Sequence, residues 1–137
     1  MIKHCAFILM GLMAFVSLSF AQLLPSAYSC SRVDLYKPPL RREDCRDSLN
    51  LFPVPNGDNV IYLGSGNWRG CGSCKVTIYN RGSRESRVTA PKGWAATAVH
   101  QAFDHCEGKP GSATIGDDGK IIAKIDYGNS GQGDCPP

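Results

Sequence analysis

The stretch Cys71-Gly72-Ser73-Cys74-Lys75-Val76-Thr77-Ile78-Tyr79-Asn80 decides how this chain folds. From Cys74 onward its side chains alternate between an apolar set and a polar set, namely Cys74, Val76 and Ile78 against Lys75, Thr77 and Tyr79. An alternation of period two predicts a β-strand with one buried face. Because two cysteines three positions apart open the stretch, this strand is expected to be central and to carry at least one disulfide anchor.

The first 21 residues have the features of a secretory signal peptide. Lys3 and His4 give a basic start, an apolar run follows, and the small residues Ser19 and Ala21 precede an expected cleavage site before Gln22. The alternative is a retained membrane helix, which the short apolar run and the lack of a basic stop-transfer flank disfavour. We therefore predict a signal peptide at residues 1–21 and a single secreted, disulfide-rich domain at residues 22–137.

Removal of this signal peptide takes away Cys5 and leaves an even number of cysteines: Cys30, Cys45, Cys71, Cys74, Cys106 and Cys135. Such a set in a small secreted chain predicts three structural disulfides, and six cysteines allow fifteen pairings. The pairing we favour joins Cys45 to Cys74, so that a helix sits on the sheet. It also joins Cys30 to Cys71, and Cys106 to Cys135.

Charge gives little indication of a partner. Without the signal peptide, 14 basic residues stand against 12 acidic ones, because the 15 basic residues of the full chain include Lys3. A net charge of about +2 is too small to indicate a nucleic-acid partner.

Hydrophobic periodicity predicts the remaining elements. In order, these are a strand at 31–36, a helix at 40–52, a strand at 59–63, a glycine-rich loop at 64–70, the strand at 71–80, a turn at 81–87 with a short extension at 87–89, a helix at 94–106 and a strand at 120–127. The strands at 59–63 and 71–80 are expected to pair. This β-α-β-β-α-β order predicts an α+β fold, a two-layer α/β sandwich with two helices on one face of an antiparallel sheet.

Catalytic and metal sites are not expected. The Cys71-Gly72-Ser73-Cys74 pair is compatible with redox or zinc chemistry, but a strand follows it and no second ligand pair stands at a suitable spacing. His100 and His105 are five positions apart and so do not share a helix face. We therefore expect no catalytic residue, no metal and no cofactor.

A small secreted ribonuclease is the enzyme alternative. That chemistry needs a paired general acid and base on the sheet, usually including a histidine or glutamate. The strands offer instead Lys75, Thr77, Tyr79, Lys124 and Asp126.

Two loops are candidate binding surfaces. Trp68 and Arg69 lie in the glycine-rich loop, and Arg81, Arg84 and Arg87 lie in the turn after the central strand. Ordinary solvated loops are the simpler interpretation, and Glu85 weakens the basic patch. Trp68 is either an exposed binding anchor or part of the core, and the sequence favours neither.

The order of these elements resembles a known family. A helix opening with Arg42-Glu43-Asp44-Cys45, a strand reading Cys74-Lys75-Val76-Thr77-Ile78 and a helix ending Ala102-Phe103-Asp104-His105-Cys106 resemble those of fungal small secreted cysteine-rich proteins. Many of these are candidate effectors of plant-pathogenic fungi, and their fold resembles the α/β sandwich of the killer toxins of smut fungi. The resemblance covers residues 40–127 and carries over no catalytic residue.

This resemblance implies a secreted effector, present in the host apoplast or delivered into the host cell, that binds a host or partner protein without catalysis. A plant immune receptor is a conceivable second partner. The first alternative is a killer-toxin-like protein that acts on membranes or channels of target cells, and the second is the ribonuclease.

Overall fold

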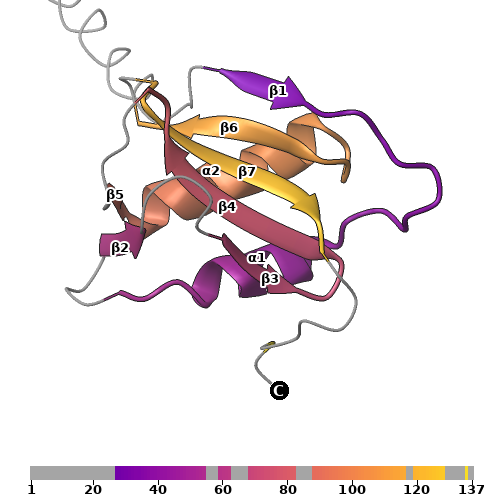
Figure 1. The fold of residues 1–137 in the computed structure, drawn as a ribbon, viewed down its shortest axis with the longest axis horizontal. Coiled ribbons are helices and arrows are strands. Elements are labelled where there is room, and N and C mark those ends of the chain that lie inside the picture. The colour runs from indigo at the N-terminus through magenta and orange to yellow at the C-terminus, as the bar shows by residue number, and fades with distance from the viewer. Residues whose placement is uncertain are drawn as a thin grey trace, which may run out of the picture.

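The computed structural model describes residues 27–54, 59–62, 68–82, 88–116, 119–128 and 135. The expected signal peptide lies outside these residues. The elements are β1 (Tyr28–Cys30), α1 (Arg42–Asn50), β2 (Asn59–Tyr62), β3 (Trp68–Cys71), β4 (Cys74–Asn80), β5 (Val88–Pro91), α2 (Lys92–His105), β6 (Gly111–Ile115) and β7 (Ile121–Tyr127), arranged as in Figure 1.

The central strand of the sequence analysis is β4. It lies inside a five-stranded antiparallel sheet of order β1-β6-β7-β4-β3, where it pairs with β7 along its whole length and with β3 across a tight turn. A second sheet of two strands joins β2 to β5. The predicted disulfide-stabilised α+β fold is confirmed.

Both helices cover one face of the larger sheet, which we call the inner face (Figure 1). There Cys74, Val76 and Ile78 of β4 are fully buried, as their alternation predicts. Their neighbours across β7 are Tyr127, Ile125 and Ala123. The opposite side, the outer face, carries the polar set of β4.

Helix α2 lies close to the sheet because small side chains meet there. Its buried positions are Ala95, Ala98, Val99 and Ala102, and the facing strands contribute Ala113 and Ala123 to the same core. Helix α1 adds Cys45 and Leu49, with Phe52 just beyond its end. The spacing of these residues at three and four positions is what places them on one helical side.

Three expectations about strands are wrong. Residues 31–36 form no strand, because the extended segment is β1, which ends at Cys30 before a turn at Asp34. Residues 68–70, expected to be loop, belong to strand β3, and the expected strand at 71–80 is interrupted, because the two-residue turn Gly72-Ser73 folds β3 directly beside β4. Residues 59–62 pair with β5, since β3 and β7 already occupy both edges of β4.

Strand β6 (Gly111–Ile115) was not expected at all. Its polar residues Ser112 and Thr114 alternate with Gly111, Ala113 and Ile115, but Ile115 is the single strongly hydrophobic residue among the five, so the periodic signal is weak. Nevertheless it pairs with both β1 and β7 and buries Ala113 and Ile115.

One of the three disulfide assignments is confirmed and two are wrong. Cys45–Cys74 is present, whereas Cys30 joins Cys106 and Cys71 joins Cys135. Cys30–Cys71 is excluded by topology, because β1 and β3 are opposite edges of the sheet. Cys106 reaches Cys30 because Gly111, the neighbour of Cys30 across the sheet, has no side chain to fill the space beside the Cys106 sulfur.

Candidate functional site

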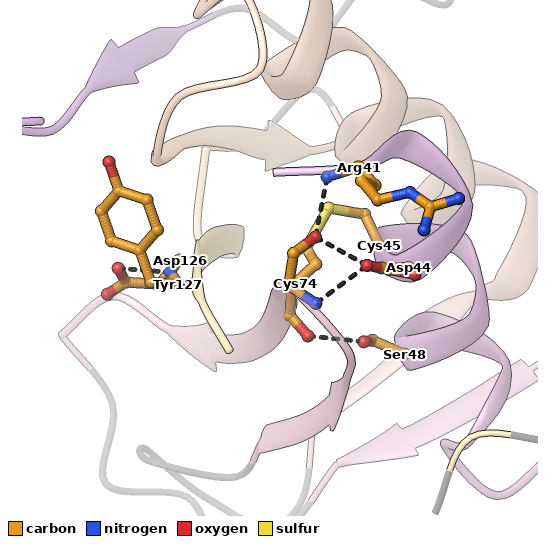
Figure 2. Close-up of a disulfide and its surroundings, with 8 residues drawn as sticks. Arg41, Asp44, Cys45, Ser48, Cys74, Asp126 and Tyr127 are labelled. Carbon is orange, nitrogen blue, oxygen red and sulfur yellow. Dashed lines mark hydrogen bonds between the residues drawn. A yellow bond between two sulfur atoms is a disulfide. The ribbon is translucent and has the colours of Figure 1, made fainter. Parts of the chain in front are cut away.

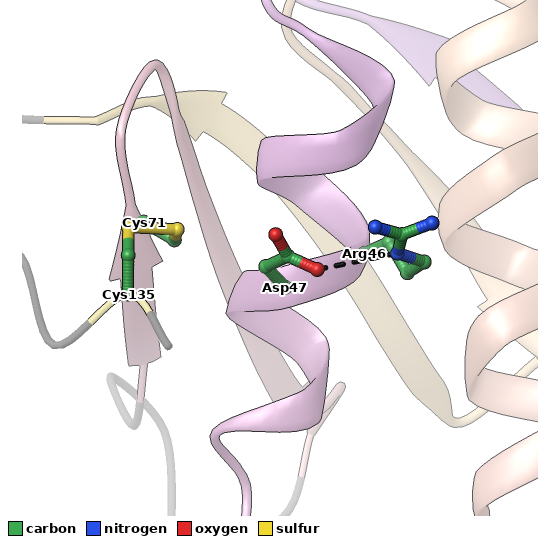
Figure 3. Close-up of polar contacts among 4 residues, drawn as sticks. All are labelled: Arg46, Asp47, Cys71 and Cys135. Carbon is green, nitrogen blue, oxygen red and sulfur yellow. Dashed lines mark hydrogen bonds and ion pairs between the residues drawn. A yellow bond between two sulfur atoms is a disulfide. The ribbon is translucent and has the colours of Figure 1, made fainter. Parts of the chain in front are cut away.

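The Cys71-Gly72-Ser73-Cys74 segment is a two-residue hairpin turn in which both cysteines are engaged elsewhere. Cys71 and Cys74 stand opposite each other in the register of β3 and β4. Cys74 is bonded inward to Cys45 of α1 (Figure 2), and Cys71 is bonded to Cys135 near the C-terminus (Figure 3). The pair therefore fastens the hairpin to two distant parts of the chain and has no free thiol.

Helix α1 holds this hairpin with polar contacts as well. The Asp44 carboxylate accepts hydrogen bonds from the backbone N–H of Ser73 at 2.8 Å and from its hydroxyl at 2.7 Å (Figure 2). The Ser73 Oγ also accepts one from the Arg41 N–H at 2.8 Å. Buried Ser48 donates to the Cys74 carbonyl at 2.8 Å. The segment Cys71–Cys74, expected to carry structural disulfides, thus joins α1 to the β3–β4 hairpin.

These hydrogen bonds favour the ionised form of the Asp44 carboxyl group. Burial raises the pKa of Asp44, but the hydrogen bonds from Ser73 and the nearby Arg41 outweigh burial, so the pKa lies below its usual value. The ionised form is therefore the one that the fold stabilises.

Among the described residues of the two predicted binding loops, Trp68 and Arg69 point to opposite faces of the sheet. Trp68, on β3, is 39% exposed on the outer face, while the Arg69 guanidinium turns to the helix side and lies 5.3 Å from the centre of the Phe52 ring. Neighbouring residues of a strand point to opposite faces, which separates them. Arg81 lies in the turn beyond β4, where its N–H donates to the Lys120 carbonyl at 2.7 Å. Arg84 and Arg87 lie outside the described residues.

His100 and His105 both lie on α2, on the helix side of the molecule. The ring of His105 stacks on Tyr28, with ring centres 4.7 Å apart. Burial and the charge of Arg42 lower the pKa of His100. Arg42 itself is ion-paired with Asp104, the residue that lies one turn beyond His100. Neither ring reaches the outer face of the sheet.

Among the residues that the structure describes, the most exposed large apolar side chains lie where a strand was expected, in the segment 31–41 that we call the β1–α1 loop. Its tip presents Val33, Leu35 and Tyr36, which are 42%, 90% and 98% exposed. Figure 1 shows the loop standing out from the body of the protein. A single exposed apolar residue is common, but an adjacent Leu–Tyr pair almost wholly in solvent is not.

The tip is a defined turn. The Lys37 N–H donates to the Asp34 carbonyl at 3.1 Å, and the Tyr36 N–H donates to the Asp34 carboxylate at 3.0 Å. The Asp34 N–H donates in turn to the Tyr127 hydroxyl of β7 at 3.2 Å, and the Lys37 amine lies 5.3 Å from the centre of the Tyr127 ring. An aspartate that bonds the backbone two residues on is a recognised turn former, and this was the signal available in the sequence.

Both ends of the loop are tied to the turn that follows α2. The Ser31 N–H donates to the Pro110 carbonyl at 2.8 Å, next to the Cys30–Cys106 disulfide. The Leu40 N–H donates to the Gly108 carbonyl at 3.0 Å. Exposed basic residues flank the tip, namely Arg32, Lys37 and Arg41. The result is a fixed, basic loop with an apolar tip.

No family model, curated protein or solved structure matches the chain. Within the residues that the structure describes, no group of three or more His, Cys, Asp or Glu side chains could hold a metal ion. In the same part of the chain, no helix is long and apolar enough to span a bilayer.

Proposed function

We propose that this protein is a secreted effector that acts by binding a host or partner protein without catalysis, and that the β1–α1 loop is its main contact. Three disulfides in so small a protein are compatible with an extracellular location. The observation that carries the proposal is the exposure of Leu35 and Tyr36, at 90% and 98%, on a loop held by hydrogen bonds at its tip and at both ends.

Binding energy in protein interfaces is concentrated in a few apolar and aromatic side chains that enter pockets of the partner. Leu35 and Tyr36 are suited to act as such anchors, because the turn at Asp34 and the hydrogen bond to Tyr127 fix the loop before a partner binds. A fixed loop loses less conformational entropy on binding than a flexible one. The basic residues Arg32, Lys37 and Arg41 favour a partner whose apolar pocket has an acidic rim.

The test compares the mature chain, starting at Gln22, with a Leu35→Ser/Tyr36→Ser double variant in affinity purification from plant tissue. Both side chains are exposed, so the variant is expected to keep the fold and the disulfides. We expect the recovery of a discrete partner to fall by about tenfold or more, as for loss of one hot-spot residue. Trp94→Ser, which removes an exposed aromatic on α2, is the matched control and is expected to bind as the wild type does.

Three results would contradict the proposal. Equal recovery by the double variant would remove the loop from the interface. Growth inhibition of sensitive cells by the purified protein would favour the killer-toxin-like alternative. Cleavage of RNA above background, lost in a His100→Ala/His105→Ala variant, would favour the ribonuclease.

A further inference from the structure

The outer face of the five-stranded sheet carries a continuous row of polar side chains with an aromatic ring at one end. Directly paired residues in neighbouring strands share a face, so the register places Trp68 beside Thr77, Thr77 beside Lys124, and Lys124 beside Ser112. Ser29 of β1 follows Ser112 at the far edge. Side chains in such a row repeat at the spacing of the strands, about 4.8 Å.

The Trp68 side chain packs against its own strand. Its six-membered ring extends along β3 over Gly70, and a methyl group at position 70 would lie 3.4 Å from ring atom Cζ3. Gly70 therefore leaves room for the ring to rest on the strand, an arrangement known for glycines of edge strands. The Lys75 amine lies 5.7 Å from the centre of the ring, and 39% of the residue is exposed. An indole held in this way offers a fixed aromatic surface to a ligand.

Charges on this face nearly cancel. Among the described residues of this face, Lys124 is ion-paired with Asp126 at 3.3 Å, and Lys75 lies over the Trp68 ring. Thr77, Ser112 and Ser29 contribute hydroxyl groups, which both donate and accept hydrogen bonds. A nearly balanced surface of this kind is a poor electrostatic match for a polyanion, whose binding rests on many unpaired basic residues.

The face is also too polar for a conventional protein interface. Among its described residues, Trp68 alone is an exposed large apolar side chain, and Ile122 is buried. Protein interfaces have an apolar centre from which charged residues are depleted. The match is better for a hydroxyl-rich, uncharged ligand that has one flat apolar surface.

We propose that this face binds a neutral polysaccharide. The C–H groups on one side of a pyranose ring pack against the negative face of the Trp68 indole, and Lys75, Thr77 and Lys124 hydrogen-bond the hydroxyl groups of the same and the next sugar. Lys75 moves aside from the ring to do so, which its long side chain allows. This site uses none of the residues of the β1–α1 loop, and so it goes beyond the proposed function.

The experiment is co-sedimentation of the mature chain with three insoluble neutral polysaccharides: chitin, cellulose and a β-1,3-glucan. We expect binding to at least one of them, unchanged between about 0.05 and about 1 M sodium chloride because the ligand carries no charge for salt to screen. Trp68→Ala is expected to weaken the association about tenfold or more, and Trp68→Phe to retain most of it. Lys75→Ala is expected to weaken it to a smaller extent.

Two variants serve as controls. Trp94→Ala removes the other exposed tryptophan, and Leu35→Ser/Tyr36→Ser removes the loop tip; both are expected to sediment as the wild type does. Circular dichroism and a disulfide map establish that Trp68→Ala is folded.

Absence of binding to all three polysaccharides would overturn the inference, as would equal binding by a folded Trp68→Ala variant. Binding that disappears as salt is raised would overturn it too, since it would indicate charge attraction. Loss of polysaccharide binding in the loop variant would also count against a separate site. Failure here leaves partner capture through Leu35 and Tyr36 unaffected, so the two proposals fail independently.

Discussion

Asp44 joins the first turn of α1 to the β3–β4 hairpin through two hydrogen bonds from Ser73. An ionised acceptor in such a bond contributes about 1–2 kcal/mol more to folding than a neutral one. We therefore predict that Asp44→Asn lowers the free energy of unfolding by about 1–2 kcal/mol at neutral pH. Urea denaturation, monitored by tryptophan fluorescence, measures this change in the free energy of unfolding.

The same substitution has a defined pH dependence. Because the folded pKa of Asp44 is lowered, its contribution is complete above the unfolded pKa of about 4 and is lost as the pH falls through the folded value. The difference between wild type and Asp44→Asn is thus expected to be constant above about pH 5 and to shrink below about pH 4. A difference that stays unchanged down to about pH 2 would show that the charge does not matter.

The residue scale also shows where a sequence pattern misleads. Val33 and Leu35 alternate with polar neighbours as strand residues do, yet both are exposed in the β1–α1 loop. The competing local signal was Asp34, whose side chain bonds the Tyr36 N–H and closes a turn. Trp68 is a different case. Whether it lies in the core or on the surface depends on the strand β3, which was predicted to be loop, and on Gly70, which leaves room for the ring.

At the scale of elements, the β3–β4 hairpin depends on Gly72. Its φ of +53° is costly for other residues, and a side chain there would also lie 2.6 Å from the Asp44 carboxylate. We predict that Gly72→Ala costs about 2–4 kcal/mol, because it combines backbone strain with the loss of the Ser73–Asp44 bonds. Thermal and urea unfolding give the value.

Gly82→Ala is the matched control for this prediction. Gly82 has a φ of +83° but nothing within 4 Å of a methyl group, so only the backbone strain of about 1 kcal/mol applies. Equal costs for the two variants would mean that the contact with Asp44 contributes nothing.

Most of the elements that were predicted correctly have a strong apolar pattern, and β2 was predicted from its β-branched and aromatic residues. The strands β4 and β7 and the helices α1 and α2 each show a clear apolar stripe in the sequence, and each packs as that stripe predicts. β6 has one strongly hydrophobic residue, Ile115, and it is a strand because β1 and β7 pair with it on both sides. The partner β1 is distant in sequence, and the weak local pattern of β6 does not report it.

At the scale of the whole molecule, three disulfides join elements that are 76, 29 and 64 residues apart in sequence. They differ in access to solvent: Cys45 and Cys74 are 1% and 0% exposed, whereas Cys30 and Cys135 are exposed ends of the other two bonds. A reductant reaches a buried disulfide only when the protein opens. We predict that Cys45–Cys74 is reduced last under native conditions.

The order in which the three disulfides are reduced is measured by partial reduction with a phosphine, alkylation of the free thiols and peptide mapping. The Cys45→Ala/Cys74→Ala variant is expected to lose about 2–5 kcal/mol of stability, since it loses both the crosslink and core packing. Early labelling of Cys45 or Cys74, while either of the other bonds is intact, would contradict the burial on which this prediction rests.

The pairing of the disulfides shows the limit of sequence reasoning at this scale. Cys45–Cys74 was predicted because the apolar face of a helix has to pack on the central strand, and both elements are visible in the sequence. The other two bonds depend on which strands form the edges of the sheet, and the order β1-β6-β7-β4-β3 includes β6, a strand that was not predicted from its weak pattern. The loop tip and the Trp68 row depend on the same topology.

The central claim is that a rigid scaffold presents Leu35 and Tyr36 to a protein partner, and site-specific photo-crosslinking tests it most directly. Benzoylphenylalanine is placed at Tyr36 in one sample and at Thr97, an exposed position on α2, in another. Each protein is irradiated in plant tissue extract. We predict a discrete crosslinked partner from position 36 and none from position 97. Equal crosslinking from the two positions, or none from position 36, would contradict the claim.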